Sequence, residues 1–548
     1  MYSVKTNIRQ LVSLMLRHGV RDVVVSPGSR NMPLAETFAH VAEISCYPVT
    51  DERSAGFIAL GISQRKNVPV AVCVTSGSAL LNLASSVSEA YYQQIPLLVI
   101  SADRPLAWIG QMDGQTLPQT GVFGSLVKYE ANLCEPNNDT ERWFNNRLIN
   151  EALLALTYRW KGPVHVNVPI SEPFFDCGCM ELPDERVIGR KDILHHAKEL
   201  NNLWCASHSP LVIVGQMVSP DYAERLSDVL ERLHCPVLCE SLSNVHGAAV
   251  FHDFDLTLIS ADNQRDLAPD MVVYLGGHLV SKRLKQWLRG VRPAICWRVS
   301  EEDSVADTFQ CLTDVVDADP ISLLDSLAQC SSQGRDAYLR KWREAERTTV
   351  SKKAPSLPFS SIETVRRFCD VLPTDSTLVL ANSSAVRYAQ LSAPRKDVTV
   401  FCNRGVNGID GSLSAAVGVA MADLSREVFL LIGDLSFFYD MNALWNTALP
   451  SNIHILLLNN GGGEIFRNLP GLKESEGTRK FVMAEHRASA CEWVKSVGCD
   501  YLSAHDFSEF ESGLSSFLEK KNSPSFMEVF TDAREDESAH REFYNRFK

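Results

Sequence analysis

The sequence lacks the features by which membrane proteins and nucleic-acid-binding proteins are most easily recognised. No apolar run approaches the length of about 20 residues that a membrane-spanning helix needs. Lys and Arg number 53 against 66 Asp and Glu, which leaves a net charge of −13. An acidic chain of this kind is a poor non-specific partner for nucleic acids or anionic membranes. We therefore expect neither nucleic acid nor a membrane among its partners.

Paired cysteine motifs are also missing, although cysteine itself is frequent. The 15 cysteines are an odd number, and no Cys-x-x-Cys occurs among them. Residues 1–18 carry charge and place apolar side chains at i, i+3 and i+4, which is typical of an amphipathic helix and not of a signal peptide. We therefore expect reduced thiols in a cytoplasmic protein, with a metal site or a disulfide as the alternative.

The length of 548 residues predicts about three domains. Short apolar runs rich in β-formers alternate with helical stretches throughout, which predicts open, mostly parallel α/β sheets with helices on both faces. We place the domains at about 1–180, 185–350 and 356–548, with residues 354–358 (Ala-Pro-Ser-Leu-Pro) as a linker.

Two glycine-containing polar clusters follow apolar strands in the last third of the chain. Gly433-Asp-Leu-Ser436 follows the run 427–432, and Asn459-Asn-Gly-Gly-Gly463 follows the run 453–458. Residues 440–449 are expected to form the helix between them, with Asp440 as its N-cap. Strands joined in this way are parallel, so both clusters fall at the carboxyl edge of a sheet, where such sheets bind ligands.

These clusters contain oxygen atoms suited to Mg²⁺. Asp434 offers a carboxylate, and Asn460, 26 residues later, offers a side-chain carbonyl. The glycines let the backbone approach closely enough to add another carbonyl. This all-oxygen set leaves coordination sites for phosphate and water. The alternative is a plain βαβ unit with Asx turns at its loops.

The arrangement of Gly-Asp, helix and Asn-Asn resembles the thiamine diphosphate and Mg²⁺ motif of the pyruvate decarboxylase and acetolactate synthase superfamily. Leu435 stands where that motif usually has Gly or Ala. The resemblance implies thiamine diphosphate with Mg²⁺ (or Mn²⁺), the metal being held by Asp434, Asn460 and the Gly462 carbonyl. It makes 1–180 the pyrimidine-binding domain and 356–548 the diphosphate-binding domain.

The same resemblance implies the other cofactor-binding residues. Glu52, after the second strand, would hydrogen-bond the aminopyrimidine ring and activate the cofactor, and it should be buried. Ile409, 25 residues before Asp434, would hold the cofactor bent. The implied cofactor-binding residues are Glu52, Thr75, Ser76, Gly77, Ile409, Gly433, Asp434, Leu435, Ser436, Asn460, Gly462, Ile465 and Phe466.

Four motifs in the first third point to one branch of this superfamily. Ser26-Pro-Gly-Ser-Arg30, Asp51-Glu-Arg53, Thr75-Ser-Gly77 and Ser101-Ala-Asp-Arg-Pro105 resemble the 2-succinyl-5-enolpyruvyl-6-hydroxy-3-cyclohexene-1-carboxylate synthase family. The resemblance implies a transferase of menaquinone biosynthesis. Such an enzyme decarboxylates 2-oxoglutarate and adds the succinyl-semialdehyde carbanion to isochorismate. The family's Gln-containing loop is matched only loosely here, and from it we carry over Gln115 as a catalytic residue.

The strand-end loops carry basic residues although the chain is acidic. If these loops converge, they form a cationic pocket suited to dicarboxylates such as 2-oxoglutarate and isochorismate. Glu464 would form a variable rim beside this pocket. The substrate-binding residues expected from the resemblance are Ser29, Arg30, Arg104, Gln115, Lys282, Arg283, Ser383, Arg387, Arg404, Ile465 and Phe466.

The resemblance also implies a homodimer or a dimer of dimers, with active sites at the subunit interface. Two alternatives stay open. One is an acetolactate synthase-type enzyme, which would need a flavin-binding middle domain or a smaller, less cationic pocket. The other is a catalytically silent binding protein with the same fold, which would be expected to have lost Glu52, Asp434 or Asn460.

Overall fold

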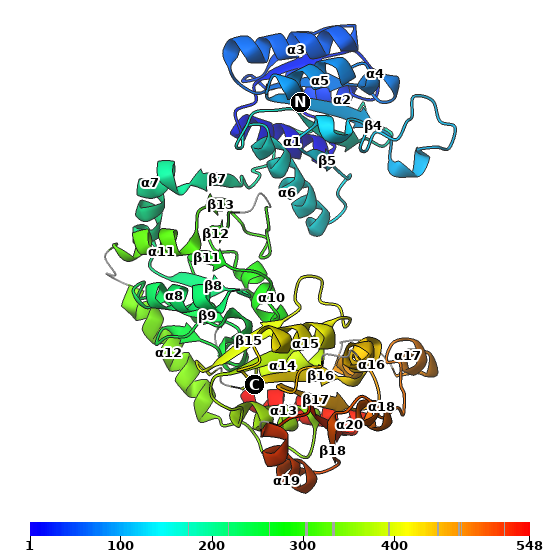
Figure 1. The fold of residues 1–548 in the computed structure, drawn as a ribbon. Coiled ribbons are helices and arrows are strands. Elements are labelled where there is room, and N and C mark those ends of the chain that lie inside the picture. The colour runs from blue at the N-terminus through cyan, green and yellow to red at the C-terminus, as the bar shows by residue number, and fades with distance from the viewer. Residues whose placement is uncertain are drawn as a thin grey trace. The chain divides into compact units, whose positions relative to one another are not determined.

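A computed structural model describes all but a few short segments of the chain. It forms two compact units, residues 1–191 with 303–315, and residues 192–302 with 316–548 (Figure 1). The residues outside the description are 174, 218, 262–263, 302–304, 331–334, 393–394, 446–448, 469–471, 473 and 520, together with the side chains of 65, 464 and 468.

The first unit contains a six-stranded sheet in which every neighbouring pair of strands is parallel. The strand order is β2 (Ser45–Pro48), β1 (Asp22–Val25), β3 (Val70–Val74), β4 (Leu97–Asp103), β6 (Val164–Pro169) and β5 (Glu130–Asn132). Its helices are α1 (Thr6–Arg17), α2 (Met32–Ala39), α3 (Glu52–Lys66), α4 (Ser78–Leu81), α5 (Ala84–Tyr92) and α6 (Asp139–Ala155).

Helices cover both faces of this sheet because successive strand residues point to opposite sides. Val23 of β1 belongs to a buried cluster with side chains of α1, α2 and α6. Its neighbour Val24 belongs to a second cluster with side chains of α3, α4 and α5. The β1, β3 and β4 side chains are almost all buried, as a parallel sheet between two helical layers requires.

The second unit contains a sheet formed by the central part of the chain. The strands β10 (Val250–Phe251), β9 (Val237–Cys239), β8 (Pro210–Val214), β11 (Met271–Leu275) and β12 (Ile295–Val299) lie side by side in this order, and all are parallel. β7 (Gly189–Asp192) and β13 (Asp314–Asp317) lie where the chain passes between units. The helices here are α7 (Ile193–Ala206), α8 (Pro220–Glu231), α9 (Phe254–Ser260), α10 (Lys282–Val291), α11 (Pro320–Ala328) and α12 (Arg335–Ser351).

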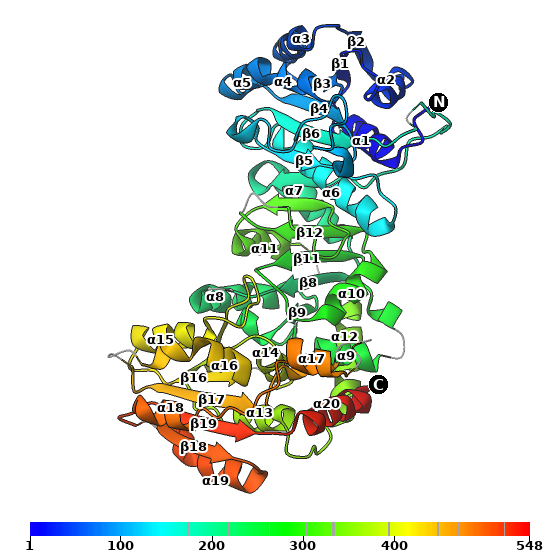
Figure 2. The same cartoon turned by 90° about the vertical axis from the view of Figure 1, so that its right-hand side faces the viewer.

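The last third of the chain forms another six-stranded parallel sheet (Figure 2). The order is β15 (Val398–Cys402), β14 (Ser376–Leu380), β16 (Val428–Gly433), β17 (Ile453–Asn459), β19 (Ser525–Phe530) and β18 (Asp500–Ala504). Its helices are α13 (Ser361–Asp370), α14 (Ser384–Ala389), α15 (Ser412–Ala422), α16 (Asp434–Asp440), α17 (Glu476–Phe481), α18 (Cys491–Ser496), α19 (Phe507–Leu518) and α20 (Ala533–Phe547).

The α/β fold with parallel sheets expected from the sequence is therefore confirmed. The C-terminal sheet lies in a hydrophobic cluster that also includes Leu242, Leu256 and Val280 of the central part, all of them outside its strands. The domain limits near 180 and 350 stay a prediction. In the described part of the chain, no helix is both long and apolar enough to cross a membrane.

One expected helix was placed wrongly. The helix after the Gly-Asp cluster is α16, which begins at Asp434 itself, and a 3₁₀ turn follows at Met441–Leu444. Asp440 does not cap a helix over 440–449, because its carboxylate accepts hydrogen bonds from the backbone N–H and the hydroxyl of Ser414, both at 2.7 Å. Residues 446–448 of the expected helix lie outside the described residues.

Candidate active site

Asp434 connects the carboxyl ends of two neighbouring strands. It follows β16, which pairs in parallel with β17, and its side chain is buried. One carboxylate oxygen accepts hydrogen bonds from the N–H groups of Gly461 and Gly462, each at 2.9 Å. The other accepts from the N–H of Leu435 at 2.6 Å. The two polar clusters recognised in the sequence thus meet at one carboxylate.

The glycines of the second cluster are required by the backbone conformation. Gly461 has φ +80° and Gly462 has φ +153°, values that side-chain-bearing residues rarely adopt. A Cβ on Gly462 would lie 2.7 Å from the Met483 carbonyl oxygen. The Gly463 N–H donates to the same carbonyl at 2.6 Å. The loop can therefore pack against residues 483–486 only with glycine at these positions.

His486 lies beside the Asp434 carboxylate. Its side-chain Nε2 is 3.4 Å from Asp434 Oδ2, and its backbone N–H donates to the Gly461 carbonyl at 2.9 Å. The neighbouring carboxylate raises the pKa of the His486 imidazole, against a smaller opposing effect of burial. The sequence analysis missed His486, because a lone His in a loop gives no signal.

The two consecutive asparagines have different surroundings. Asn459 is buried, and its amide nitrogen donates to the Ala488 carbonyl and to Glu528, at 2.8 and 2.7 Å. Its Oδ1 accepts from the Gly461 N–H at 3.3 Å. Asn460 is only half-buried and lines an adjacent pocket. Of the two, Asn460 is therefore better placed to reach a ligand, and its role as a metal ligand stays a prediction.

Glu528 is a buried carboxylate that the sequence analysis missed. It lies in the apolar strand β19 and accepts hydrogen bonds from the Ser489 hydroxyl, the Ala490 N–H and the Tyr501 hydroxyl, besides Asn459. These bonds hold residues 488–490 against β17 and β19. A lone Glu within an otherwise apolar strand was the available signal.

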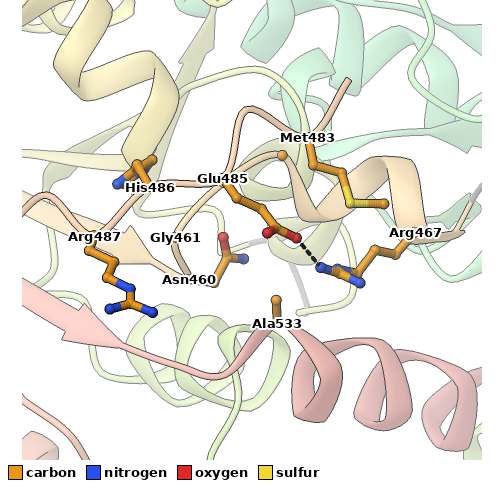
Figure 3. Close-up of a pocket in the computed structure, with 10 residues that line it drawn as sticks. Asn460, Gly461, Arg467, Met483, Glu485, His486, Arg487 and Ala533 are labelled. Atoms are coloured by element: carbon orange, nitrogen blue, oxygen red, sulfur yellow. Dashed lines mark hydrogen bonds and ion pairs between the residues drawn. The ribbon is translucent and has the colours of Figure 1, made fainter. Parts of the chain in front are cut away.

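A pocket of about 370 Å³ lies beside the Asn-Asn-Gly loop (Figure 3). Arg467, His486 and Arg487 give it a basic lining, although Arg467 is paired with Glu485 at 2.9 Å. The complete lining is Asn460, Gly461, Gly462, Gly463, Arg467, Met483, Glu485, His486, Arg487 and Ala533. The basic side chains around this pocket suit a phosphate group.

The residues present fit the implied metal and cofactor. Asp434 supplies a hard oxygen, Asn460 lies in the loop held by that carboxylate, and the close approach at Gly462 leaves no room for a side chain. Among the described residues, no group of three or more His, Cys, Asp and Glu side chains is arranged to hold a metal ion. The expected set differs from such a group, since it combines one carboxylate with an amide and a backbone carbonyl.

Further residues of the second unit that the sequence analysis expected to contact the cofactor are Ile409, Ser436, Ile465 and Phe466. The Ser436 hydroxyl donates to the Ile409 carbonyl, which links α16 to the loop after β15. The Ile409 side chain is exposed, as expected for a residue that would touch a ligand. Ile465 and Phe466 are half-buried in a short 3₁₀ helix, and a Cβ on Gly463 would meet the Phe466 ring at 2.8 Å. The Glu464 side chain lies outside the described residues.

In the first unit, Glu52 occupies the first turn of α3. Asp51 caps that helix, accepting from the Ser54 N–H at 3.1 Å. Glu52 accepts a hydrogen bond from the Asn82 side chain at 3.0 Å. We expected a buried Glu52, but in this chain it is half-buried, because it lies in an exposed first turn of α3, where Asp51 and Arg53 on either side of it are exposed. Its role in activating the cofactor stays a prediction.

The Thr75-Ser-Gly77 turn is buried and packs against the polar loop that follows β4. Gly77 has φ +85°, and a Cβ there would lie 3.1 Å from the Gln115 backbone. Gln115 itself has φ +57° and an exposed side chain. The buried partner of this turn is Gln119, whose Oε1 accepts from the Gly77 N–H at 2.8 Å. Gln119 was missed, since nothing in the sequence distinguishes it from its neighbours.

Arg30 and Arg104, which follow β1 and β4, converge on one carboxylate. Arg30 is buried and donates to the Ile170 carbonyl at 2.8 Å and to Glu172 at 3.2 Å. Arg104 lies 3.8 Å from Glu172 and 3.2 Å from Asp113. Burial, and then the charge of Arg104, lower the pKa of Arg30. Ser29, next to Arg30, is exposed.

A second pair of arginines lies in the second unit. Arg404 is buried and donates to Asn382 at 2.8 Å, and Arg387 donates to the Ser383 carbonyl at 2.6 Å. Burial, and then the charge of Arg404, lower the pKa of Arg387. Ser383 has φ +70° at the start of α14. The loops after β14 and β15 therefore do bring their predicted cations together.

Lys282 and Arg283 begin α10 and are both exposed. Arg283 pairs with Asp255 at 3.3 Å. Just before this helix, the buried Glu240 carboxylate accepts hydrogen bonds from the backbone N–H groups of Val280 and Ser281. The shortest bond to each is 2.7 Å. Burial raises the pKa of the Glu240 carboxyl.

One further basic residue of α10 was missed. Lys285 is half-buried, and its Nζ donates to the Leu279 carbonyl at 2.8 Å. Burial lowers its pKa, Glu240 opposes this effect, and Arg404 lowers the pKa further. Lys285 therefore belongs to the same cationic group as the predicted residues.

Comparison with known proteins supports the class that this fold and site define. A model of the thiamine pyrophosphate enzyme N-terminal TPP binding domain matches residues 6–123. A middle-domain model of thiamine pyrophosphate enzymes matches 191–380, and the C-terminal TPP binding domain model matches 381–529. The fold and site are thus those of the thiamine diphosphate-dependent enzymes.

Individual relatives narrow this class. The chain is 46% identical to a 2-succinyl-5-enolpyruvyl-6-hydroxy-3-cyclohexene-1-carboxylate synthase of Phocaeicola vulgatus, over 100% of this chain and 99% of the relative. Synthases with the same name from Bacteroides thetaiotaomicron and Flavobacterium johnsoniae are 43% and 35% identical, over 100% and 98% of both chains. The chain belongs to this family of synthases, as its N-terminal motifs predicted.

Proposed function

We propose that this chain decarboxylates 2-oxoglutarate and adds the resulting succinyl-semialdehyde unit to isochorismate, as a transferase of menaquinone biosynthesis. The observation that carries the proposal is the similarity to synthases of this name over the full length of the chain. The site geometry agrees with it, because the two clusters of the diphosphate motif meet at Asp434.

Thiamine diphosphate, when bound, supplies the electron sink that decarboxylation and carbon–carbon bond formation need. Mg²⁺ (or Mn²⁺) would be held by Asp434, Asn460 and the Gly462 carbonyl, which are hard oxygen ligands. Glu52 would hold a proton on the aminopyrimidine ring and so activate the cofactor. Gln115 would contact the reacting groups from the loop that packs against Gly77.

The substrates explain the basic residues. 2-Oxoglutarate and isochorismate each carry two carboxylates, which arginine binds in bidentate fashion. Arg30 and Arg104 already converge on the exposed carboxylate of Glu172, so a substrate carboxylate could take its place. Arg387 and Arg404, together with Lys282 and Arg283, would bind carboxylates in the second unit.

We further propose a cytoplasmic homodimer, or a dimer of dimers, with composite sites. Glu52 lies in the first unit and Asp434 in the second. Each would bind one end of the cofactor. Building one site from two subunits would bring the two halves together.

The direct test combines the purified protein with thiamine diphosphate, Mg²⁺ and 2-oxoglutarate, with and without isochorismate. Consumption of isochorismate absorbance and release of CO₂ that both require 2-oxoglutarate are the expected result. The Asp434→Ala variant serves as the matched inactive control. In a parallel assay with pyruvate in place of 2-oxoglutarate, CO₂ release without use of isochorismate would instead favour an acetolactate synthase-type activity.

A further inference from the structure

The C-terminal helix α20 carries a fully buried carboxylate that the proposed reaction does not use. Asp536 accepts hydrogen bonds from the N–H and the hydroxyl of Ser361, both at 2.6 Å. It also accepts from the Thr531 hydroxyl at 2.7 Å and from the Asn460 amide nitrogen at 3.3 Å. The match to the C-terminal TPP binding domain ends at residue 529, before this helix begins.

Three of these four donors fix the position of Asp536 without help from Asn460. The Ser361 N–H is a backbone donor at the start of α13, so the Oδ1 atom of Asp536 must accept. The Ser361 and Thr531 hydroxyls both donate to the Oδ2 atom of Asp536. The carboxylate is therefore set by the fold, and Asn460 adapts to it.

This arrangement determines which way the Asn460 amide faces. An ionised carboxylate only accepts hydrogen bonds, so it selects the amide NH₂ group and turns the carbonyl oxygen to the other side. In Figure 3 the nitrogen of Asn460 is on the side of Ala533, the first residue of α20, and the oxygen points away from it. Mg²⁺ binds an amide through its oxygen, so only this orientation makes Asn460 a ligand.

We propose that Asp536 is a positioning residue for the metal site, which holds the Asn460 amide so that its oxygen, and not its nitrogen, faces the ion. The inference rests on the proposed Mg²⁺ site. Residues that orient metal ligands in this way are a general requirement of such sites. The competing explanation is that Asp536 only anchors α20 to Ser361 and Thr531, with no effect on Asn460.

The variant Asp536→Asn separates the two explanations. Its carbonyl oxygen must stay on the Ser361 N–H, which leaves the new NH₂ group on the Oδ2 side. The hydroxyls can rotate to accept from it, but Asn460 can accept only by turning its own oxygen toward residue 536. Because that turn removes a metal ligand, we expect Mn²⁺ affinity to fall about 10- to 100-fold.

Mn²⁺ itself is the probe, titrated with thiamine diphosphate present and followed by the electron paramagnetic resonance signal of the free ion. Glu535→Gln is the control, since it makes the same charge change at an exposed position of the same helix. It should leave Mn²⁺ affinity unchanged. Thermal melting of the cofactor-free proteins reports any loss of folding separately.

The double variant Asp536→Asn/Asn460→Asp tests orientation directly. An aspartate at position 460 has two equivalent oxygens, so one can accept from the new amide at position 536 while the other binds the ion. We expect Mn²⁺ affinity to recover to within about threefold of the wild-type value. Unchanged affinity in Asp536→Asn, or a loss that the double variant does not restore, would mean that Asp536 is only an anchor.

Two further variants keep the outcome clear. If Asp536→Asn does not fold, Thr531→Val removes one of the donors that fix the carboxylate, and it should weaken Mn²⁺ binding about fivefold; no change would overturn the inference. Asp434→Ala tests the metal site itself and should abolish tight Mn²⁺ binding. If Asp434→Ala still binds Mn²⁺ tightly, the proposed metal site is wrong, and the role of Asp536 is rejected with it. If Asp434→Ala loses Mn²⁺ binding but Asp536→Asn binds Mn²⁺ normally, only the role of Asp536 is rejected.

Discussion

The carboxylate of Asp434 and the N–H of Gly462 are 2.9 Å apart although 28 residues separate them in the chain. The bond joins the loops after β16 and β17, and the same oxygen atom also accepts the Gly461 N–H. Because both loops depend on one buried carboxylate, a change at Asp434 should affect the loop conformation and the proposed metal site together.

Asp434→Ala should therefore weaken the binding of Mg²⁺ and thiamine diphosphate by at least about tenfold, since it removes a ligand and takes away an acceptor of the Leu435, Gly461 and Gly462 N–H groups. Isothermal titration of the cofactor at several Mg²⁺ concentrations measures the effect. If excess Mg²⁺ makes the variant and wild-type affinities equal, the metal site lies elsewhere.

Glu52→Gln should abolish turnover while cofactor binding stays close to normal. The amide of the variant cannot hold the proton that activates the aminopyrimidine ring, but it keeps the size of Glu52 and can still pair with Asn82. The measurement is the exchange rate of the cofactor C2 proton by NMR, with a titration for affinity. A near-normal exchange rate would reject the activating role of Glu52.

Mixing the two inactive variants tests the composite site. If one site uses Glu52 of one subunit and Asp434 of the other, a mixed dimer has one site with both lesions and one with neither. After random subunit exchange, about a quarter of wild-type activity should return. Mass spectrometry verifies the exchange, and complete exchange without any recovery would mean that each site is built within one chain.

Gly462→Ala should disrupt the loop, because the new Cβ would lie 2.7 Å from a backbone oxygen at a φ of +153°. We expect at least about a tenfold loss of thiamine diphosphate affinity, together with a lower melting temperature. Gly290→Ala in α10 is the matched control. Nothing lies within 4 Å of its added Cβ, so the variant should be neutral or more stable by about 0.5–1 kcal/mol. Equal behaviour of the two variants would contradict the tight packing of the loop.

Stability should fall in mild acid because of two half-buried histidines, His252 and His540. Burial lowers the pKa of His540 to about 4, and burial together with His246 lowers that of His252 to about 4, from the ordinary value of 6.5. Between pH 6.5 and 4 the unfolded chain binds these protons and the folded chain does not, so the free energy of unfolding decreases as the pH falls.

His540→Phe should make this decrease shallower by up to about 1.4 kcal/mol per pH unit, since one proton-binding group is lost from the unfolded chain. Denaturant unfolding at a series of pH values between about 4 and 7 measures the slope. The exposed His208→Gln variant serves as a control and should keep the wild-type slope. An unchanged slope in His540→Phe would show that folding does not lower the pKa of this histidine.

Local patterns in the sequence were sufficient for the fold class and for much of the site. Apolar runs bounded by glycine and polar residues indicated β1, β3, β16 and β17, because a parallel strand buried on both faces leaves a continuous apolar run. The spacing from Asp434 to Asn460 indicated that one crossover separates them. These features depend on neighbours in the chain, and one sequence is enough to show them.

The tertiary structure decided what depends on distant partners. It showed that α16 begins at Asp434 and ends at Asp440, whose carboxylate accepts a hydrogen bond from Ser414 of another helix. It distinguished Asn459 from Asn460, since only the fold brings Glu528 and Asp536 to the two amides. Residue types and spacing specify which strand-end groups are available for chemistry. Their orientation is set by buried hydrogen bonds across long sequence separations, and a linear pattern does not record those bonds.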